Sequence, residues 1–150
     1  MKDIYLIDTS IFMYARGEDH KYKCACSNII LAIGSGLFEQ RFGQPVTDSE
    51  LHQEILYRYS LIGRWNTAVS LLCDIQKLGI GVFPIGKEET DKIINLAEKY
   101  KDKGISPRDI VHAAAMKTNN IKKIITTDKD FDKMQEVERI DPCSLRFKER

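Results

Sequence analysis

Two short apolar runs, one near each end of the chain, finish in the same polar pattern. The run IYLI at residues 4–7 leads into Asp8, and the run KKIITT at residues 122–127 leads into Asp128. Short runs rich in β-branched residues predict buried strands. Helical periodicity dominates the chain between them, which predicts right-handed crossovers and a mainly parallel sheet with helices on both faces. The expected fold class is therefore α/β with three layers, α/β/α.

The intervening chain divides into helical segments and two further short strands. Periodicity and capping residues predict helices over residues 22–38, 51–63, 67–78, 88–100 and 106–118. Further strands are predicted over residues 80–85 and 137–140. The first of these is expected at a sheet edge, because Pro84 cannot donate a ladder hydrogen bond.

Local signals refine three of these segments. Gly34 and Gly36 weaken the first helix, and the helix over residues 88–100 is expected to turn Ile93, Ile94, Leu96 and Ala97 inward. The stretch RFGQPVTDS, residues 41–49, is predicted to be a connection because Gly43 and Pro45 interrupt it. The four residues TDSE at 47–50 fit a capping box for the helix that follows.

Composition limits the function classes. A chain of 150 residues suits one domain, residues 1–150, with a short basic C-terminal tail, SLRFKER. No apolar run approaches the roughly 20 residues of a membrane span, and no signal peptide is recognised, so a cytoplasmic location is expected. A net charge of +1 excludes a globally basic nucleic-acid-binding protein but leaves room for a local basic rim. The four cysteines lack the paired spacing of a zinc site.

The two strand-end aspartates indicate where a site would lie. Ligands in open parallel sheets bind beyond the carboxyl ends of the strands, where the strand order changes direction. Asp8 and Asp128 both follow strands, although each could also be a helix N-cap or a turn residue. Two strands that both close in threonine and aspartate favour a shared site.

Two further acids have competing interpretations. Asp109 follows Ser106 and Pro107 at the helical position where a capping box places its acid, so its position alone favours a structural cap. Glu54 flanks an apolar helix stripe, where a carboxylate needs a cation or water as a partner. The alternative for Glu54 is a solvated position paired with Arg58 four residues later.

The residues around these acids also have structural and functional readings. His112, one turn after Asp109, is expected to be a packed, hydrogen-bonded core residue more than a ligand or an acid–base group. Several cations close in sequence to the acids are either solvated or rim a phosphate-binding cleft: Lys99, Lys101, Lys103, Arg108 and Lys129. Three aromatic residues either stack on bases or pack in the core or a dimer: Tyr57, Tyr59 and Trp65.

Four short segments together resemble the PIN-domain family, which includes the toxin ribonucleases of the VapBC type and nuclease domains of RNA-processing factors. In chain order they are IYLIDTSIFMY, SELHQEILYRY, SPRDIVHAAAM and IITTDKDFDK. The resemblance spans about residues 3–141 and implies a PIN-like fold. The segment before Glu54, around LAIGSGLFEQRFGQ, is longer than in many compact members, which predicts an altered substrate-facing surface.

The resemblance also implies a set of site residues. The acids that match the family's motifs are Asp8, Glu54, Asp109 and Asp128, with Asp130 as a helper or substitute for the last. In the family such acids hold Mg²⁺ or Mn²⁺, ions that suit carboxylate oxygens, for phosphodiester hydrolysis. Neighbouring hydroxyl groups are expected to orient carboxylates or bound water: Thr9, Ser10 and Thr126.

Two other protein classes gather aspartates at strand ends. An aspartyl-phosphate phosphatase would place a second aspartate two residues after the first, but Thr9 and Ser10 follow Asp8. A phosphoacceptor receiver would carry an acidic pair on the first strand and a lysine after a late strand, and neither pattern is clear. A non-catalytic PIN-like module would lack one of the four acids, and none is missing.

The sequence thus predicts a metal-dependent ribonuclease that hydrolyses RNA. The single bare domain favours the toxin of a toxin–antitoxin pair, with a small antitoxin protein as partner. A PIN endonuclease that processes ribosomal or transfer RNA is the alternative. The resemblance further implies a homodimer.

Overall fold

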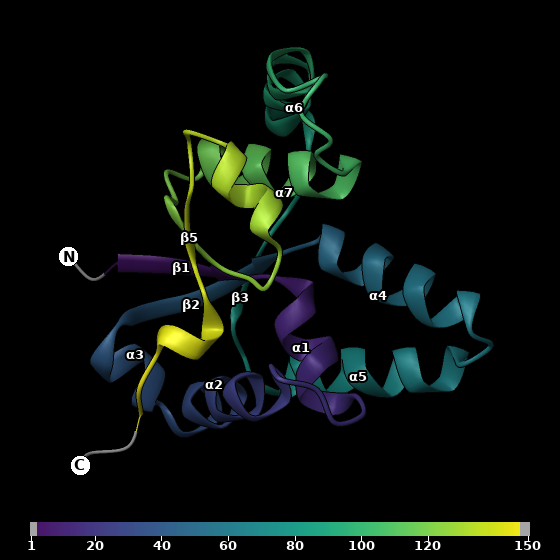
Figure 1. Ribbon diagram of the computed structural model, residues 1–150, viewed down its shortest axis with the longest axis vertical. Coiled ribbons are helices and arrows are strands. Elements are labelled where there is room, and N and C mark those ends of the chain that lie inside the picture. Colours follow the sequence, from purple (N-terminus) through teal and green to yellow (C-terminus); the bar gives the residue numbers. More distant parts are fainter. Residues whose placement is uncertain (1–2, 148–150) are drawn as a thin grey trace.

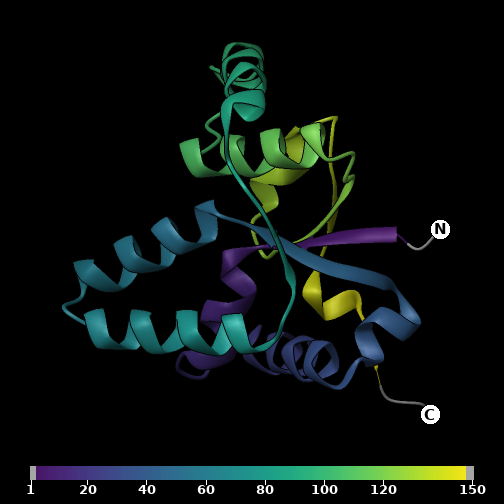
Figure 2. The same ribbon diagram turned by 180° about the vertical axis from the view of Figure 1, so that it is seen from behind.

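The computed structural model describes residues 3–147 and contains one parallel sheet with the strand order β3-β2-β1-β4-β5 (Figures 1 and 2). The strands are β1 (Asp3–Ile7), β2 (Gly43–Asp48), β3 (Gly81–Phe83), β4 (Lys123–Ile125) and β5 (Glu138–Ile140). The α-helices are α1 (Thr9–Arg16), α2 (Lys23–Ser35), α3 (Leu37–Arg41), α4 (Glu50–Leu61), α5 (Trp65–Lys77), α6 (Lys87–Lys99) and α7 (Pro107–Thr118). Two 3₁₀ turns follow the late strands: η1 (Lys129–Lys133) and η2 (Pro142–Ser144). All four strand pairings are parallel, as the sequence predicts.

Apolar side chains cover both faces of the sheet. Along β1, Tyr5 and Ile7 face one core, formed largely with α1, α2, α4 and α5, whereas Leu6 faces a second core with α6 and α7. This alternation follows from the two-residue period of a strand. Figure 1 shows the two groups of helices on opposite sides of the sheet. The predicted three-layer α/β/α architecture is confirmed.

The strand order creates a crevice at the carboxyl ends of the central strands. From β1 the chain continues to β2 on one side and reaches β4 on the other, so the connections diverge there. Ile7 pairs with Ile125, and the backbone N–H of Asp8 donates to the Ile125 carbonyl at 3.0 Å. The apolar runs at residues 4–7 and 122–127 therefore lie side by side, which brings the polar residues that follow them together.

The prediction of a connection over residues 41–49 is wrong, because β2 occupies most of it. Gly43 and Pro45 are typical of a turn, yet the strand is buried between β1 and β3. β3 pairs with β2 only from Val46 onward, so Pro45 adjoins a single strand and its missing N–H is tolerated.

The capping box predicted at 47–50 is also wrong. Ser49 precedes α4 without a side-chain cap, and its hydroxyl accepts a hydrogen bond from the Ile85 N–H at 3.0 Å. The carboxylate of Asp48 accepts instead from the Glu50 N–H at 3.1 Å. The side chains of Ser49 and Asp48 thus hydrogen-bond the segment after β3 and the first residue of α4.

Other differences concern helix ends and faces. The helix predicted over 22–38 is divided at Gly36, whose φ of +83° ends α2 before α3 begins. On α6, Leu96 is buried as predicted, but Ile94 and Ala97 are exposed because only one stripe of this helix packs against α7. The sequence predictions contain no helix at 9–16, where α1 follows β1. The predicted edge position of the strand over 80–85 is confirmed by β3.

The sequence also predicts a short basic C-terminal tail and no membrane-spanning segment. Of the basic tail SLRFKER, residues 148–150 lie outside the described part of the structure. Within residues 3–147, no helix combines the length and apolar character that a membrane crossing requires.

The start of β2 offers a test of the sheet register. Gly43 has a φ of +152°, and a Cβ at this position would lie 2.1 Å from the Asp3 carbonyl oxygen. We expect Gly43→Ala to lower the free energy of unfolding by about 1–3 kcal/mol from backbone strain alone, with the clash adding to this. Urea unfolding of the variant would measure the loss.

Gly34→Ala is the matched control. Gly34 lies inside α2, and its added Cβ would make only an ordinary contact of 3.6 Å with Leu78. This substitution should stabilise the protein by about 0.5–1 kcal/mol. A Gly43→Ala variant as stable as the wild type would contradict the register.

Candidate active site

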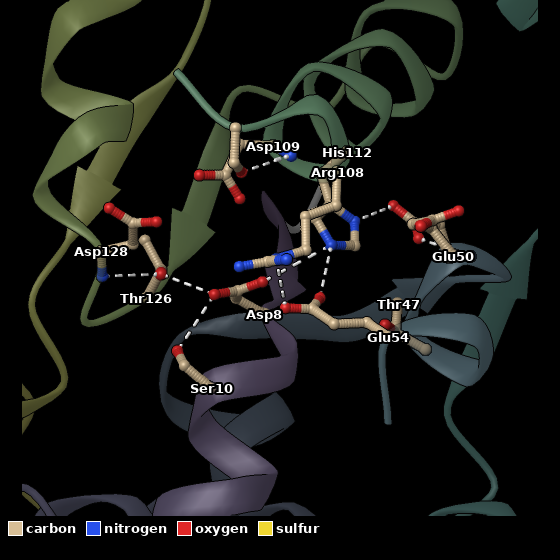
Figure 3. A network of polar contacts seen from close by, with 12 residues as sticks. Asp8, Ser10, Thr47, Glu50, Glu54, Arg108, Asp109, His112, Thr126 and Asp128 are labelled. Atoms are coloured by element: carbon tan, nitrogen blue, oxygen red, sulfur yellow. Dashed lines mark hydrogen bonds and ion pairs between the residues drawn. The ribbon is translucent and has the colours of Figure 1, made fainter. Parts of the chain in front are cut away.

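The four acids expected from the sequence line one cavity of about 780 Å³ at the carboxyl ends of the strands. They come from four places in the fold: Asp8 directly after β1, Glu54 in α4, Asp109 in the first turn of α7, and Asp128 between β4 and η1. Figure 3 shows Asp8 and Glu54 turned toward His112, with Asp109 and Asp128 beside them. The fold thus brings together carboxylates that are up to 120 positions apart in the chain (8 against 128).

Asp8 is held by two hydroxyl groups. Its Oδ2 atom accepts hydrogen bonds from Ser10 Oγ at 3.0 Å and from Thr126 Oγ1 at 2.7 Å. Burial raises the pKa of Asp8, and the nearby Glu54 charge adds to this, while His112 and the two hydroxyl groups oppose it. Ser10 and Thr126 therefore hydrogen-bond the same oxygen of this carboxylate, which restricts its orientation.

Glu54 is buried and paired with arginine. Its Oε2 atom lies 2.8 Å from Arg108 Nε and 3.9 Å from Arg58. Burial would raise the pKa of Glu54, but His112, Thr9 and Arg108 outweigh this effect and the pKa is lowered. The pairing with Arg58 exists, whereas the solvated flank position considered for Glu54 is wrong, because only 6% of the residue is exposed.

Asp109 combines a capping position with an unsatisfied carboxylate. Ser106 caps α7 by accepting from the Asp109 N–H at 3.3 Å. The Oδ2 atom of Asp109, however, is buried and has no hydrogen-bond partner among the described residues. Burial, followed by hydrogen bonding with Asp128 and the charges of Asp8 and Asp128, raises the pKa of Asp109 to about 8. A buried, unpartnered carboxylate oxygen indicates a ligand that the protein itself does not supply.

Asp128 occupies the fourth position and Asp130 the next one outward. The Asp128 N–H donates to Thr126 Oγ1 at 3.0 Å, and its Oδ1 accepts from the Asp130 N–H at 2.9 Å. Asp130 pairs with Lys133 at 2.8 Å and does not line the cavity. Asp128 is therefore the better placed of the two, although Asp130 lies close enough to share a cation with it and Asp109.

His112 lies next to Asp8 and Glu54. It is fully buried and hydrogen-bonded, as predicted, with its Nδ1 atom 2.7 Å from Asp48 Oδ2. Its Nε2 atom lies 3.4 Å from Glu54 Oε1 and 3.6 Å from Asp8 Oδ1. Burial alone would lower the pKa of His112, but the carboxylates of Asp48, Glu54 and Asp8 raise it well above its usual value.

Asp48 is the residue of this group that sequence reasoning missed. It ends β2 just as Asp8 ends β1, and it is fully buried. The signal was available in principle, since VTD at residues 46–48 repeats the pattern of an apolar residue, threonine and aspartate. The turn-like glycine and proline before it concealed the strand.

The cations and aromatic residues are only partly where the sequence placed them. Among the expected cations, Arg108 lines the cavity, whereas Lys99 and Lys101 form ion pairs with Glu136 and Glu98. Arg58 also lines the cavity. Three aromatic residues divide between core and surface: Tyr59 is buried, and Tyr57 and Trp65 are exposed.

The donor set fits a divalent metal ion. Two groups of side chains place ligand atoms within 4.8 Å of one another: Asp8, Glu54 and His112, and Asp109, Asp128 and Asp130. Five of these six donors are carboxylates, the ligands that Mg²⁺ and Mn²⁺ favour. The unpartnered oxygen of Asp109 gives this fit a structural reason beyond composition.

Relatives with known names share almost the whole length of this chain. VapC ribonuclease Mb1869c of Mycobacterium bovis is 28% identical over 135 residues, which cover 90% of this chain and 98% of that protein. Ribonuclease VapC23 of Mycobacterium tuberculosis is 29% identical over 122 residues, 81% of this chain and 90% of that protein.

Solved structures share the fold at lower identity. VapBC2 from Rickettsia felis matches with a TM-score of 0.67 at 20% identity, over 92% of this chain and 99% of that one. FitAcB from Neisseria gonorrhoeae matches with a TM-score of 0.63 at 15% identity, over 94% of this chain and 99% of that one. The sequence model of the PIN domain family matches residues 5–137 of this chain. The chain therefore belongs to the PIN domain family, as its four sequence motifs indicated.

Proposed function

We propose that this protein is a metal-dependent endoribonuclease that hydrolyses RNA phosphodiester bonds in the cytoplasm, as the toxin of a VapBC-type pair. The observation that carries the proposal is the convergence of four acids on one cavity, with a buried oxygen of Asp109 left without a partner. The similarity to proteins named as VapC ribonucleases supports the same reaction.

The carboxylates of Asp8, Glu54, Asp109 and Asp128 would hold the metal, and Mg²⁺ or Mn²⁺ suits their oxygen atoms. A bound divalent ion supplies an activated water and stabilises charge on a phosphodiester oxygen. Fixed hydroxyl groups keep Asp8 in one orientation, so this ligand does not have to be ordered again when the ion arrives.

The arginines answer a different need, which is to bring a phosphate backbone to an acidic cavity. Arg58 and Arg108 line the cavity and both approach Glu54. The Arg108 side chain is 32% exposed, so its guanidinium group can reach a ligand while Nε remains on Glu54. Guanidinium groups suit phosphate recognition because they donate several hydrogen bonds in one plane.

Two protein partners belong to the proposal. Toxin–antitoxin complexes are among the similar structures, which supports a small antitoxin protein as one partner. A second copy of the chain is the other. Five large apolar side chains are exposed on α4, α5 and the turn between them: Tyr57, Leu61, Ile62, Trp65 and Val69.

Removal of metal is the first test. RNA cleavage should disappear in EDTA and return when Mn²⁺ or Mg²⁺ is added in excess, because the carboxylates need a cation to act on a phosphodiester. Cleavage of a labelled single-stranded RNA on a denaturing gel measures this. Undiminished cleavage in the chelator would refute the metal mechanism.

Asp109→Asn separates a ligand from a structural cap. The variant should cleave RNA orders of magnitude more slowly, and its melting temperature should gain less from added Mn²⁺. Without metal its melting temperature should stay equal or rise, because the free-energy cost of burying this acid beside Asp8 and Asp128, which raises its pKa, has been removed. Asp132→Asn is the control, since Asp132 pairs with Arg139 outside the cavity.

The raised pKa of Asp109 sets the sign of the pH dependence. An acid whose pKa rises on folding binds its proton more tightly in the native state, so its contribution lowers stability as the pH rises from 3.8 towards about 8. The metal-free wild type should therefore lose more stability across this range than Asp109→Asn. A variant that melts well below the wild type yet cleaves normally would assign Asp109 to capping alone.

The dimer proposal is tested by light scattering. The wild type should exceed the 17.2 kDa of one chain at micromolar concentration, and Leu61→Glu should shift it towards the monomer. Ile94→Glu is the matched control, because Ile94 is equally exposed but lies on α6 in the opposite layer. A monomeric wild type would contradict the dimer, and co-purification with the product of a neighbouring reading frame would test the antitoxin.

A further inference from the structure

Three buried side chains in the site each hold a close partner through one atom and turn a second atom toward one another. His112 uses Nδ1 for Asp48 at 2.7 Å, and Glu54 uses Oε2 for Arg108 at 2.8 Å. Asp8 uses Oδ2 for two hydroxyl groups. The second atom of each side chain is His112 Nε2, Glu54 Oε1 or Asp8 Oδ1, and these three atoms lie near one another (Figure 3).

The contact between His112 Nε2 and Glu54 Oε1 is a long hydrogen bond, and ligand atoms of His112, Glu54 and Asp8 all lie within 4.8 Å of one another, close enough to share an ion. Nε2 lies 3.4 Å from Glu54 Oε1 and 3.6 Å from Asp8 Oδ1. Charge-assisted hydrogen bonds are shorter, about 2.7–2.9 Å. Two donors that are each about 2.1 Å from one ion, at angles between a right angle and the tetrahedral angle, lie about 3.0–3.5 Å apart. The distance of 3.4 Å to Glu54 Oε1 falls in this range, and the distance of 3.6 Å to Asp8 Oδ1 lies just above it.

The surroundings of these three atoms resemble those of a histidine ligand. A metal-bound imidazole usually donates its second N–H to a carboxylate, which fixes the tautomer and the ring, and Asp48 stands in that position. The hydroxyl of Thr9, near enough to lower the pKa of Glu54, is fully buried and unpartnered among the described residues. It is available to a water molecule bound to such an ion.

We propose that His112 is a nitrogen ligand which, with Asp8 and Glu54, forms a site for a first-row transition-metal ion such as Mn²⁺. This inference rests on the proposed function in sharing Asp8 and Glu54 with its metal centre. Asp48 is the positioning residue that presents Nε2 to the ion. Asp109 and Asp128, on the far side of the cavity, contribute oxygen ligands only.

A nitrogen ligand changes which metal the site prefers. Mg²⁺ favours oxygen donors, whereas imidazole binds transition metals well. The site should therefore bind Mn²⁺ more tightly than Mg²⁺ by a larger margin than carboxylates alone would give. His112→Gln should reduce Mn²⁺ affinity while changing Mg²⁺ affinity less.

Pulsed electron paramagnetic resonance of Mn²⁺ bound to the full chain, prepared without a histidine tag, tests the ligand directly. The wild type should show nitrogen coupling that changes when its histidines carry ¹⁵N. The chain has three histidines, so His52→Gln, an exposed residue of α4, is the matched control and should keep the coupling. His112→Gln should lose it.

Asp48→Asn tests the positioning role. Loss of an outer partner of a metal-bound histidine typically weakens metal affinity about 10–100-fold, and calorimetric titration with Mn²⁺ should show a loss in this range. If His112→Gln fails to fold, His20→Gln and His52→Gln should both keep the coupling, which then assigns it to His112. Mn²⁺ bound without histidine coupling, or coupling that persists in His112→Gln, would overturn the inference.

The proposed function fails in a different way from this inference. Mn²⁺-dependent RNA cleavage with no nitrogen coupling would leave the nuclease intact and remove His112 from the ligand set. Nitrogen coupling in a protein that does not cleave RNA would support the histidine ligand and count against the nuclease.

Discussion

The structure depends on keeping several carboxylates buried in one place without a fixed counter-charge for each. Buried charges of like sign destabilise a fold unless hydrogen bonds, cations or a bound ion compensate for them. Each acid here meets that requirement differently: Asp8 through hydroxyl groups, Glu54 through Arg108, and Asp48 through His112. Of these acids, only Asp109 keeps a buried carboxylate oxygen without a hydrogen-bond partner among the described residues. The protein thus partners all of these acids except one buried oxygen of Asp109, which supports the proposed binding of a cation.

The topology explains why these acids meet. The three central strands of the sheet, β2, β1 and β4, are parallel neighbours. Asp48 ends β2, Asp8 directly follows β1, and Asp128 follows β4 three residues after its end, as the N-cap of η1. The middle one, Asp8, lies between the other two and contacts both sides of the site through His112 and Thr126. Helices α4 and α7 then add Glu54 and Asp109 to the same cavity. These acids are far apart in the sequence, but the parallel sheet and its flanking helices bring them to one cavity.

The sequence alone was enough to predict the acids that come after a run with the composition of a buried strand. The runs before Asp8 and Asp128 have the composition of strands, so both acids and the parallel sheet could be predicted from them. Glu54 and Asp109 needed the family resemblance, because their positions alone also suited a solvated flank and a helix cap. Asp48 was missed because Gly43 and Pro45 mimic a turn, and only the pairing with β1 and β3 turns this segment into a strand. Contacts such as those of His112 depend on three elements at once and cannot be seen in any local pattern.

The long segment before Glu54 lies away from the acidic cavity. Residues 31–44 form the end of α2, α3 and the start of β2, and none of them lines the acidic cavity. Ile33 and Phe38 are instead buried in the core beneath β1, where the ring of Phe38 lies 5.6 Å from that of Tyr5. The loop from Gly17 to His20, which follows α1, forms part of the cavity wall. Differences in substrate choice among such proteins are therefore better sought in this loop and in the α4 face opposite it, since both stand beside the proposed metal ligands while the longer segment stabilises the sheet from below.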